Sequence, residues 1–232
     1  MTNQKKRTLN ELLKKPIVTY SFLAIQLVVF LLMTIDGGSE SIATLIKYGA
    51  KENMSIAMGQ WWRLVTPMFV HIGALHIIVN SVTLYYLGIQ LEGVFGHFRF
   101  ALIYLLSGIA GNVASFAFND AVSAGASTAL FGLFGTALML AETFRHNSQM
   151  QEMAKTFAIF IGLNLVTGFM STSVDNSGHI GGLIGGFLIA TAISVPKASS
   201  DLTVKRILSG ITYLIAIAFF IAIGFKKTQI GL

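Results

Sequence analysis

The amino-acid sequence predicts an all-α protein that crosses a lipid bilayer several times. Of its 232 residues, 54% are hydrophobic and only 11% are charged, whereas an ordinary soluble domain has about 25% charged residues. Seven stretches free of Asp, Glu, Lys and Arg reach the length of about 20 residues that a spanning helix needs. The backbone in lipid must form helices or closed barrels, and no alternating barrel pattern is present.

The seven stretches follow one another without a linker or an internal repeat, which indicates one membrane domain. They comprise residues 17–35, 65–91, 100–118, 121–141, 156–174, 177–195 and 207–225. We expect a basic segment at residues 1–16, the membrane domain at 17–225 and a tail at 226–232. The basic start superficially resembles a secretory signal. However, residues 17–35 are longer than the apolar part of such a signal and lack a small-x-small cleavage site, so we interpret them as a retained first span.

The distribution of Lys and Arg predicts the orientation of the chain. With the N-terminus inside, the inner segments hold eleven of the 16 Lys and Arg residues and the outer segments hold five. Such an excess marks the cytoplasmic side, so we expect a cytoplasmic N-terminus, although Lys226 and Lys227 then lie on the disfavoured side. The longest loop, residues 36–64, is external in this arrangement. Its indoles Trp61 and Trp62 favour a position at the membrane interface.

Composition and motifs exclude several classes of function. The net charge of +6 is spread over loop ends and forms no basic face for nucleic acid. The absence of cysteine excludes disulfides, thiolate metal sites and a cysteine nucleophile. No His-Glu-x-x-His motif occurs and no carboxylate lies in a predicted span, so we expect neither a metal nor another cofactor. An aspartyl intramembrane protease would need two aspartates within spans, and all four aspartates lie in loops.

Three polar side chains lie at a similar shallow depth on the external side of separate predicted spans. His76 lies in the first half of the second span, Ser127 near the start of the fourth and His179 near the start of the sixth. Polar groups inside a membrane are costly and indicate function by default. A serine becomes a strong nucleophile when a base takes its proton. Ser127 and His179 are therefore the candidate nucleophile and base.

The second predicted span holds a further polar pair. His76 and Asn80 are four residues apart and share a helix face, where two donors could stabilise a developing negative charge on oxygen. Hydrogen bonding of Asn80 to a neighbouring helix explains the pattern equally well at this stage. A proton-coupled transporter would also use such residues, but no inverted repeat or broken helix pair is visible.

Small residues in the fourth and sixth predicted spans indicate close helix packing. In the sixth span they follow His179 at steps of three and four, and such a smooth face lets two helix backbones approach each other. The fourth span is the candidate partner, which would bring His179 toward Ser127. A serine among glycines also occurs in purely structural helix contacts. The candidate packing residues are Gly125, Gly132, Gly135, Gly182 and Gly186.

The order of these motifs resembles the rhomboid family of intramembrane serine proteases, over more than half of the chain. The resemblance rests on WR at 62–63, HIGALHIIVN at 71–80, EGVFG at 92–96, YLLSGIAGN at 104–112, GAS at 125–127 and HIGGLIGG at 179–186. No single motif is decisive, whereas their order on successive spans is highly specific. The resemblance implies a rhomboid-like six-helix bundle with an additional C-terminal transmembrane helix, the bacterial six-plus-one type.

The resemblance also implies an endopeptidase that hydrolyses peptide bonds in or near transmembrane segments through a Ser-His dyad. Ser127 would be the nucleophile and His179 the base. His76, Asn80 and the Ser127 amide would hold the oxyanion, and Phe131 would lie against the histidine ring. One departure from the family pattern is a threonine at position 128, where glycine is usual; we expect it to alter packing more than chemistry.

The implied partners are transmembrane protein substrates and membrane lipid, with a site that opens to the extracytoplasmic side. The family implies that substrates enter between the second and fifth spans. Asp175 lies four residues before His179, but its place in a short loop favours solvation over an orienting role in a triad. The main alternative is a non-catalytic rhomboid-like protein that binds membrane clients, and it is disfavoured because Ser127 and His179 are both present. The oligomeric state is not predicted.

Overall fold

The computed structural model describes residues 15–170, 174–196 and 203–230, and all the regular elements within this part are helices. The expected segment 1–16 and tail 226–232 therefore lie partly outside the described residues. Two short helices and two 3-10 turns, α3 (Ile42–Lys47), α4 (Asn53–Ala57), η1 (Trp61–Leu64) and η2 (Thr66–Phe69), form the loop after the first long helix. The long helices are α2 (Ile17–Ile35), α5 (Gly73–Phe95), α6 (His97–Phe118), α7 (Ser127–Thr143), α8 (Ser148–Phe169), α9 (Asn176–Ile193) and α10 (Thr203–Ile230).

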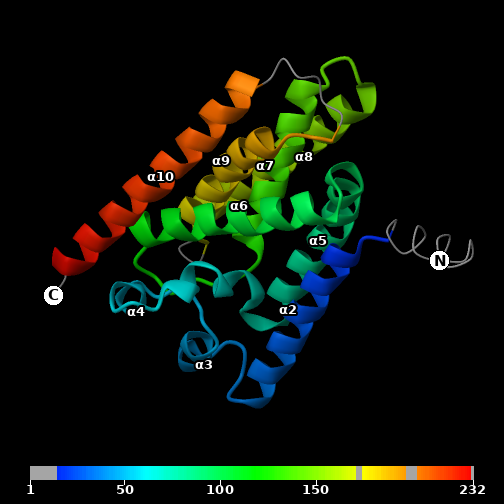
Figure 1. Ribbon diagram of the computed structural model, residues 1–232. Coiled ribbons are helices and arrows are strands. Elements are labelled where there is room, and N and C mark those ends of the chain that lie inside the picture. Colours follow the sequence, from blue (N-terminus) through cyan, green and yellow to red (C-terminus); the bar gives the residue numbers. More distant parts are fainter. Residues whose placement is uncertain (1–14, 171–173, 197–202, 231–232) are drawn as a thin grey trace, which may run out of the picture.

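The helices surround a centre formed by α6, α7 and α9 (Figure 1). Helix α9 packs against both α6 and α7, and α10 covers the outer side of α6 and α9. Helices α2 and α5 form a pair on the opposite side, and α8 contacts α7. Most residues of α7 are buried, which places this helix inside the bundle. The all-α bundle with an added C-terminal helix is confirmed.

Within the described residues, five helices are long and apolar enough to cross a membrane: α2, α5, α6, α9 and most of α10. Helix α7 is apolar but has only 17 residues. Helix α8 begins with a polar turn that includes Gln149, Gln151 and Glu152. The chain is thus a multi-pass membrane protein in which α7 is shorter, and α8 more polar at its start, than the other long helices.

Two predicted spans begin later than expected. The second begins at Gly73 instead of residue 65, because the preceding residues form 3-10 turns around Pro67, which cannot donate a backbone hydrogen bond. The fourth begins at Ser127 instead of residue 121. Here Gly125 has a φ of +133°, a conformation that is readily adopted only by glycine and that ends the preceding loop. Helix α10, by contrast, continues past residue 225 to Ile230.

A buried carboxylate joins α5 to the beginning of α2. Glu92 accepts hydrogen bonds from the backbone nitrogens of Val18 and Thr19, at 2.9 and 2.8 Å, and from the Thr19 hydroxyl at 2.6 Å. The first N–H groups of a helix lack intrahelical acceptors, and the Glu92 carboxylate is the acceptor for two of these groups in α2. The ring of His97 lies 2.5 Å from the same carboxylate. Glu92 therefore has a structural role.

Glycines let α7 and α9 approach backbone to backbone. A Cβ added at Gly186 would lie 2.0 Å from the carbonyl oxygen of Gly132, and one at Gly182 would lie 2.0 Å from that of Thr128. A Cβ at Gly135 would lie equally close to the α9 backbone, 2.0 Å from the Leu183 oxygen. No side chain fits at these distances. The structure thus brings together the two glycine faces that the sequence suggested.

Candidate active site

Ser127 is the first residue of α7, directly after a tight glycine turn. The turn is held by two hydrogen bonds: Gly125 N donates to the Pro67 oxygen at 2.9 Å, and Ala126 N donates to His71 Nε2 at 3.3 Å. A Cβ at Gly125 would lie 2.6 Å from the ring of His76. Gly125 therefore lies against His76 of α5 and not in the contact between α7 and α9. Its small size lets that imidazole approach the turn.

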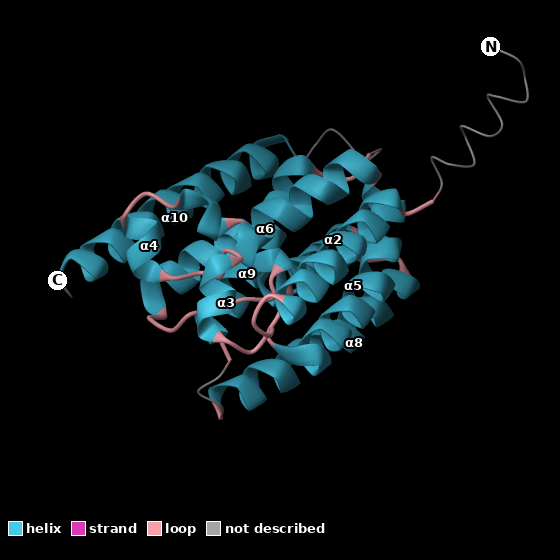
Figure 2. Cartoon of the chain, turned by 90° about the horizontal axis from the view of Figure 1, so that it is seen from below, coloured by secondary structure: helices cyan, strands magenta, loops and turns pink. Residues whose placement is uncertain are grey.

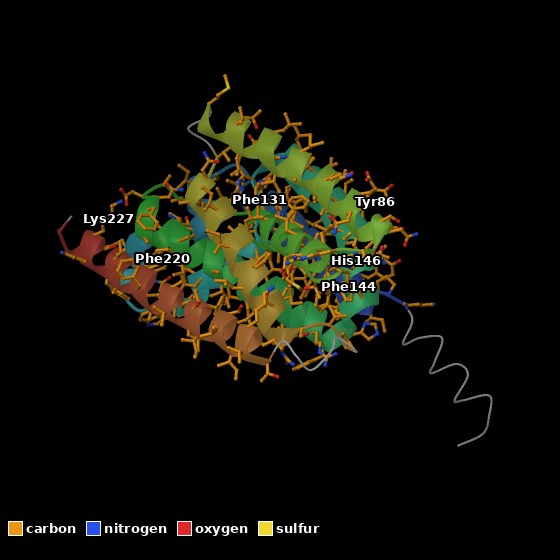
Figure 3. All side chains as sticks on the ribbon, turned by 90° about the horizontal axis from the view of Figure 1, so that it is seen from above. Tyr86, Phe131, Phe144, His146, Phe220 and Lys227 are labelled. Carbon is orange, nitrogen blue, oxygen red and sulfur yellow. The ribbon has the colours of Figure 1, made fainter. Side chains whose placement is uncertain are left out.

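His179 lies in the first turn of α9, and its Nε2 atom is 2.9 Å from Ser127 Oγ. The ring of Phe131, one turn along α7, stacks on the imidazole with 4.1 Å between centroids and 9° between planes. Figure 3 shows Phe131 in the interior of the molecule, whereas Lys227 lies at the far end of α10. A flat, close stack limits the rotation of the imidazole. The structure thus brings together Ser127, His179 and Phe131.

Asp175 does not orient the histidine. Among the described residues, the buried His179 Nδ1 atom has no hydrogen-bond partner. The Asp175 carboxylate instead caps α9: it accepts from Gly178 N at 3.0 Å and Ser177 Oγ at 2.8 Å. A third hydrogen bond comes from the hydroxyl of Ser115 in α6. The expectation that Asp175 is solvated was wrong, because the residue is only partly exposed and its oxygens have protein partners.

Electrostatics keep this carboxylate ionised. Burial raises the pKa of Asp175, but the hydrogen bonds from its three partners and the positive charge of Lys51 bring that pKa below its usual value. Asp175 is therefore negatively charged at neutral pH and stabilises the N-terminus of α9, where the helix dipole favours an anion.

His76 and Asn80 line the same cavity as Ser127 and His179. The Asn80 amide nitrogen donates to the carbonyl oxygen of His76, its own i−4 residue, at 2.9 Å. The His76 ring lies edge-on to His71 with 5.4 Å between centroids. In this structure, therefore, the Asn80 amide bonds within its own helix, and both side chains border the space in front of Ser127.

A cavity of about 560 Å³ opens in front of these groups. Its walls come from α5, the segment 119–124, α7, α8 and α9. This volume lies in the range of ordinary ligand pockets, which are mostly apolar with a few placed polar groups. Within the part of the chain that the structure describes, no three His, Cys, Asp or Glu side chains are grouped as metal ligands would be.

Sequence reasoning missed the wall that α8 contributes. Phe160, Asn164 and Thr167 line the cavity and recur at helical spacing on one face. That spacing, with two polar residues inside an apolar stretch, is the signal that could have identified them. Figure 2 shows α8 running alongside α5, and residues of both helices line the cavity.

Thr128, the departure from the family pattern, fills a niche made of glycines. Cβ atoms added at Gly111 in α6 and Gly178 in α9 would lie 2.6 and 3.1 Å from the Thr128 side chain. The additional side chain is therefore accommodated where three helices meet, on the side of α7 that faces α6 and α9.

Comparisons with known proteins agree with this architecture. A sequence model of the Rhomboid domain matches residues 58–196. The chain is 46% identical to Rhomboid protease GluP of Bacillus subtilis (strain 168) over 204 residues, 88% of this chain and 39% of that protein. It is 35% identical to Putative rhomboid protease YdcA of the same organism over 179 residues, 75% of this chain and 87% of that protein.

A plant relative extends the comparison. The chain is 38% identical to RHOMBOID-like protein 5 of Arabidopsis thaliana over 155 residues, 64% of this chain and 49% of that protein. The chain thus spans less than half of GluP and about half of the plant protein, but most of YdcA. The resemblance noted in the sequence is confirmed: the chain belongs to the rhomboid family of intramembrane serine proteases.

Proposed function

We propose that the protein is an intramembrane serine endopeptidase in which Ser127 is the nucleophile and His179 the general base. The observation that carries this proposal is the distance of 2.9 Å between Ser127 Oγ and His179 Nε2, beside a cavity large enough for a peptide. A base must lie within hydrogen-bond reach of the proton that it removes, about 2.6–3.2 Å. This pair meets that condition without any rearrangement.

The reaction proceeds in two halves. His179 Nε2 takes the hydroxyl proton as Ser127 Oγ attacks the peptide carbonyl carbon, and the same proton then passes to the leaving amine nitrogen as the C–N bond breaks. Water then attacks the acyl-enzyme ester as His179 takes its proton, the bond from the carbonyl carbon to Ser127 Oγ breaks, and His179 returns the proton to that oxygen. A triad would orient the imidazole with a carboxylate. Here the Phe131 stack supplies that orientation.

An activity-based probe tests the proposal directly. A membrane-impermeant fluorophosphonate added to intact cells should label the protein, and the modified residue should be Ser127. We propose that the N-terminus is cytoplasmic and that the cavity opens externally, in keeping with the Lys and Arg distribution. Labelling only after the cells are broken would contradict the orientation. A complete absence of labelling, in intact and in broken cells, would contradict the enzyme and favour a client-binding protein.

The oxyanion of the tetrahedral intermediate would be held by His76, Asn80 and the Ser127 amide. This assignment is supported by the shared cavity wall and by the position of Ser127 at a helix N-terminus, where N–H groups lack intrahelical acceptors. The Asn80 amide would exchange its bond to the His76 carbonyl for one to the developing oxyanion.

Replacing Asn80 by alanine should lower kcat on the order of 100- to 1000-fold, as removal of one oxyanion donor typically does, with KM little changed. The matched control is Gln90→Ala on the same helix, because the Gln90 amide also donates to its i−4 carbonyl, that of Tyr86, at 2.9 Å. Single-turnover cleavage assays would measure both variants. Equal cleavage rates for the two variants would show that Asn80 does not hold the oxyanion.

We propose that the substrates are single-span membrane proteins that enter between α5 and α8. The cavity is lined from both helices, and the contacting rings of Phe134 in α7 and Phe160 in α8 give it an apolar wall. A peptide bond inside an intact helix is shielded, so the substrate must unwind locally before cleavage. We expect small residues at the cut and helix-weakening residues nearby. Unchanged cleavage of a substrate in which leucines replace those residues would contradict this mechanism.

A further inference from the structure

A series of polar contacts joins the segment before Ser127 to the helix that carries His179. It starts at Asp175, the N-cap of α9, whose carboxylate accepts a hydrogen bond from Ser115. The Ser115 hydroxyl is fully buried near the end of α6 and lies 3.3 Å from the hydroxyl of Ser123. Ser123 belongs to the stretch that leads into α7. The end of α6, the stretch before α7 and the start of α9 therefore meet at one buried hydroxyl group.

A buried lysine, Lys51, lies at the other end of this series of contacts. The backbones of Lys51 and Ser123 exchange two hydrogen bonds, of 2.8 and 3.1 Å. The Lys51 ammonium donates to the carbonyl oxygens of Asn119 and Ala121, at 2.7 and 2.8 Å. Burial lowers the pKa of Lys51 to about 8, against the attraction of nearby carboxylates. A buried charge is costly unless fully bonded. Here two of the three bonds go to the stretch before the nucleophile and the third goes to Asn53 Oδ1, at 3.1 Å.

The two reacting groups depend on this arrangement because they belong to different segments. His179 N donates to the Asp175 carbonyl oxygen at 3.0 Å, so the cap and the base share one helical turn. The Ser127 hydroxyl follows four residues after Ser123. A change in the position of either segment alters the distance between Oγ and Nε2, and a displacement of about 1 Å can cost roughly 100-fold in rate.

We propose that Ser115 and Asp175 are positioning residues, which set the distance between nucleophile and base by tying the first turn of α9 to the stretch before α7. The inference rests on the proposed Ser127–His179 chemistry and adds a role that neither residue type nor position in the chain suggests. Asp175 acts through this tie and not through contact with the imidazole, because its oxygens already bond to Ser115, Ser177 and Gly178.

The decisive variant is Ser115→Ala, which removes one buried hydroxyl and leaves every carbon atom in place. We expect kcat and the rate of fluorophosphonate labelling to fall about tenfold, on the scale of a small misplacement of the reacting groups, while KM and Tm stay close to wild type. The matched control is Ser107→Ala on the same helix. Ser107 is equally buried, but its hydroxyl bonds to the carbonyl oxygen of Tyr104 in its own helix, so its removal should leave kcat unchanged.

A pair of variants at Asp175 separates positioning from simple folding. Asparagine keeps an oxygen that can accept from Gly178 and gains an amide that can donate to Ser115, so Asp175→Asn should retain more of kcat than Asp175→Ala. The inference is overturned if Ser115→Ala behaves like Ser107→Ala, or if the two Asp175 variants lose kcat and Tm equally. Failure of the wild-type protein to react with the probe or to cleave would instead overturn the proposed function.

Discussion

Replacing Ser127 by alanine is expected to abolish cleavage of a reconstituted single-span substrate, with a loss in kcat on the order of 10⁶-fold, as in a soluble serine protease that loses its nucleophile. Without Oγ, the imidazole 2.9 Å away has no proton to take and no acyl-enzyme can form. His179→Ala should cost about as much. The double variant should lose no more than either single one, because two groups that act as a unit are not additive.

The control for this experiment is a histidine outside the cavity. His146 is exposed between α7 and α8, so His146→Ala should leave kcat and labelling at the wild-type level. Purified Ser127→Ala should also unfold at the wild-type Tm, since the change removes a single oxygen atom. Normal cleavage by the Ser127→Ala protein would show that the nucleophile lies elsewhere.

Replacing Gly186 by alanine is expected to damage both stability and activity. The added Cβ would lie 2.0 Å from the oxygen and 2.4 Å from the Cα of Gly132, and backbone atoms cannot turn aside as a flexible side chain can. Helix α9 must therefore move away from α7. Overpacking of this kind typically costs about 1–3 kcal/mol, and the accompanying shift of His179 should reduce kcat by roughly 100-fold. Thermal unfolding in detergent and the cleavage assay would measure the two effects.

Gly162→Ala provides the matched control on α8. A Cβ at Gly162 would have nothing within 4 Å, so this variant should be neutral or gain up to about 1 kcal/mol from the better helix propensity of alanine. If both Gly186→Ala and Gly162→Ala keep the wild-type Tm and cleavage rate, the contact between α7 and α9 is looser than its glycines indicate.

The sequence was sufficient for the features that depend on local composition. Uncharged stretches of sufficient length predicted the long helices, and the glycine spacing after His179 predicted a face that can approach another backbone. The proximity of Ser127 and His179 was suggested by their equal depth in separate spans. These features could be predicted because the membrane restricts the chain to few arrangements.

The remaining features depend on contacts between distant residues. The late start of α7 follows from a turn at Gly125 that bonds to Pro67, which hydrophobicity does not reveal. Asp175 accepts a hydrogen bond from Ser115, 60 residues earlier in the sequence. A carboxylate that the sequence predicts to be solvated in a loop is therefore bonded to another part of the protein. Lys51 similarly reads as an external loop charge, although it is fully buried.

The short length of α7 has a consequence for where hydrolysis can occur. At 1.5 Å per residue, its 17 residues extend about 25 Å, less than the hydrocarbon thickness of about 30 Å. Ser127 is the first residue of α7 and lines the cavity, so with the proposed external opening the shortfall would lie at this end of the helix. The missing turn of helix, about 5 Å, would leave a hollow below the level of the lipid headgroups. Water and an unwound segment could meet the Ser127 hydroxyl there without entering the hydrocarbon.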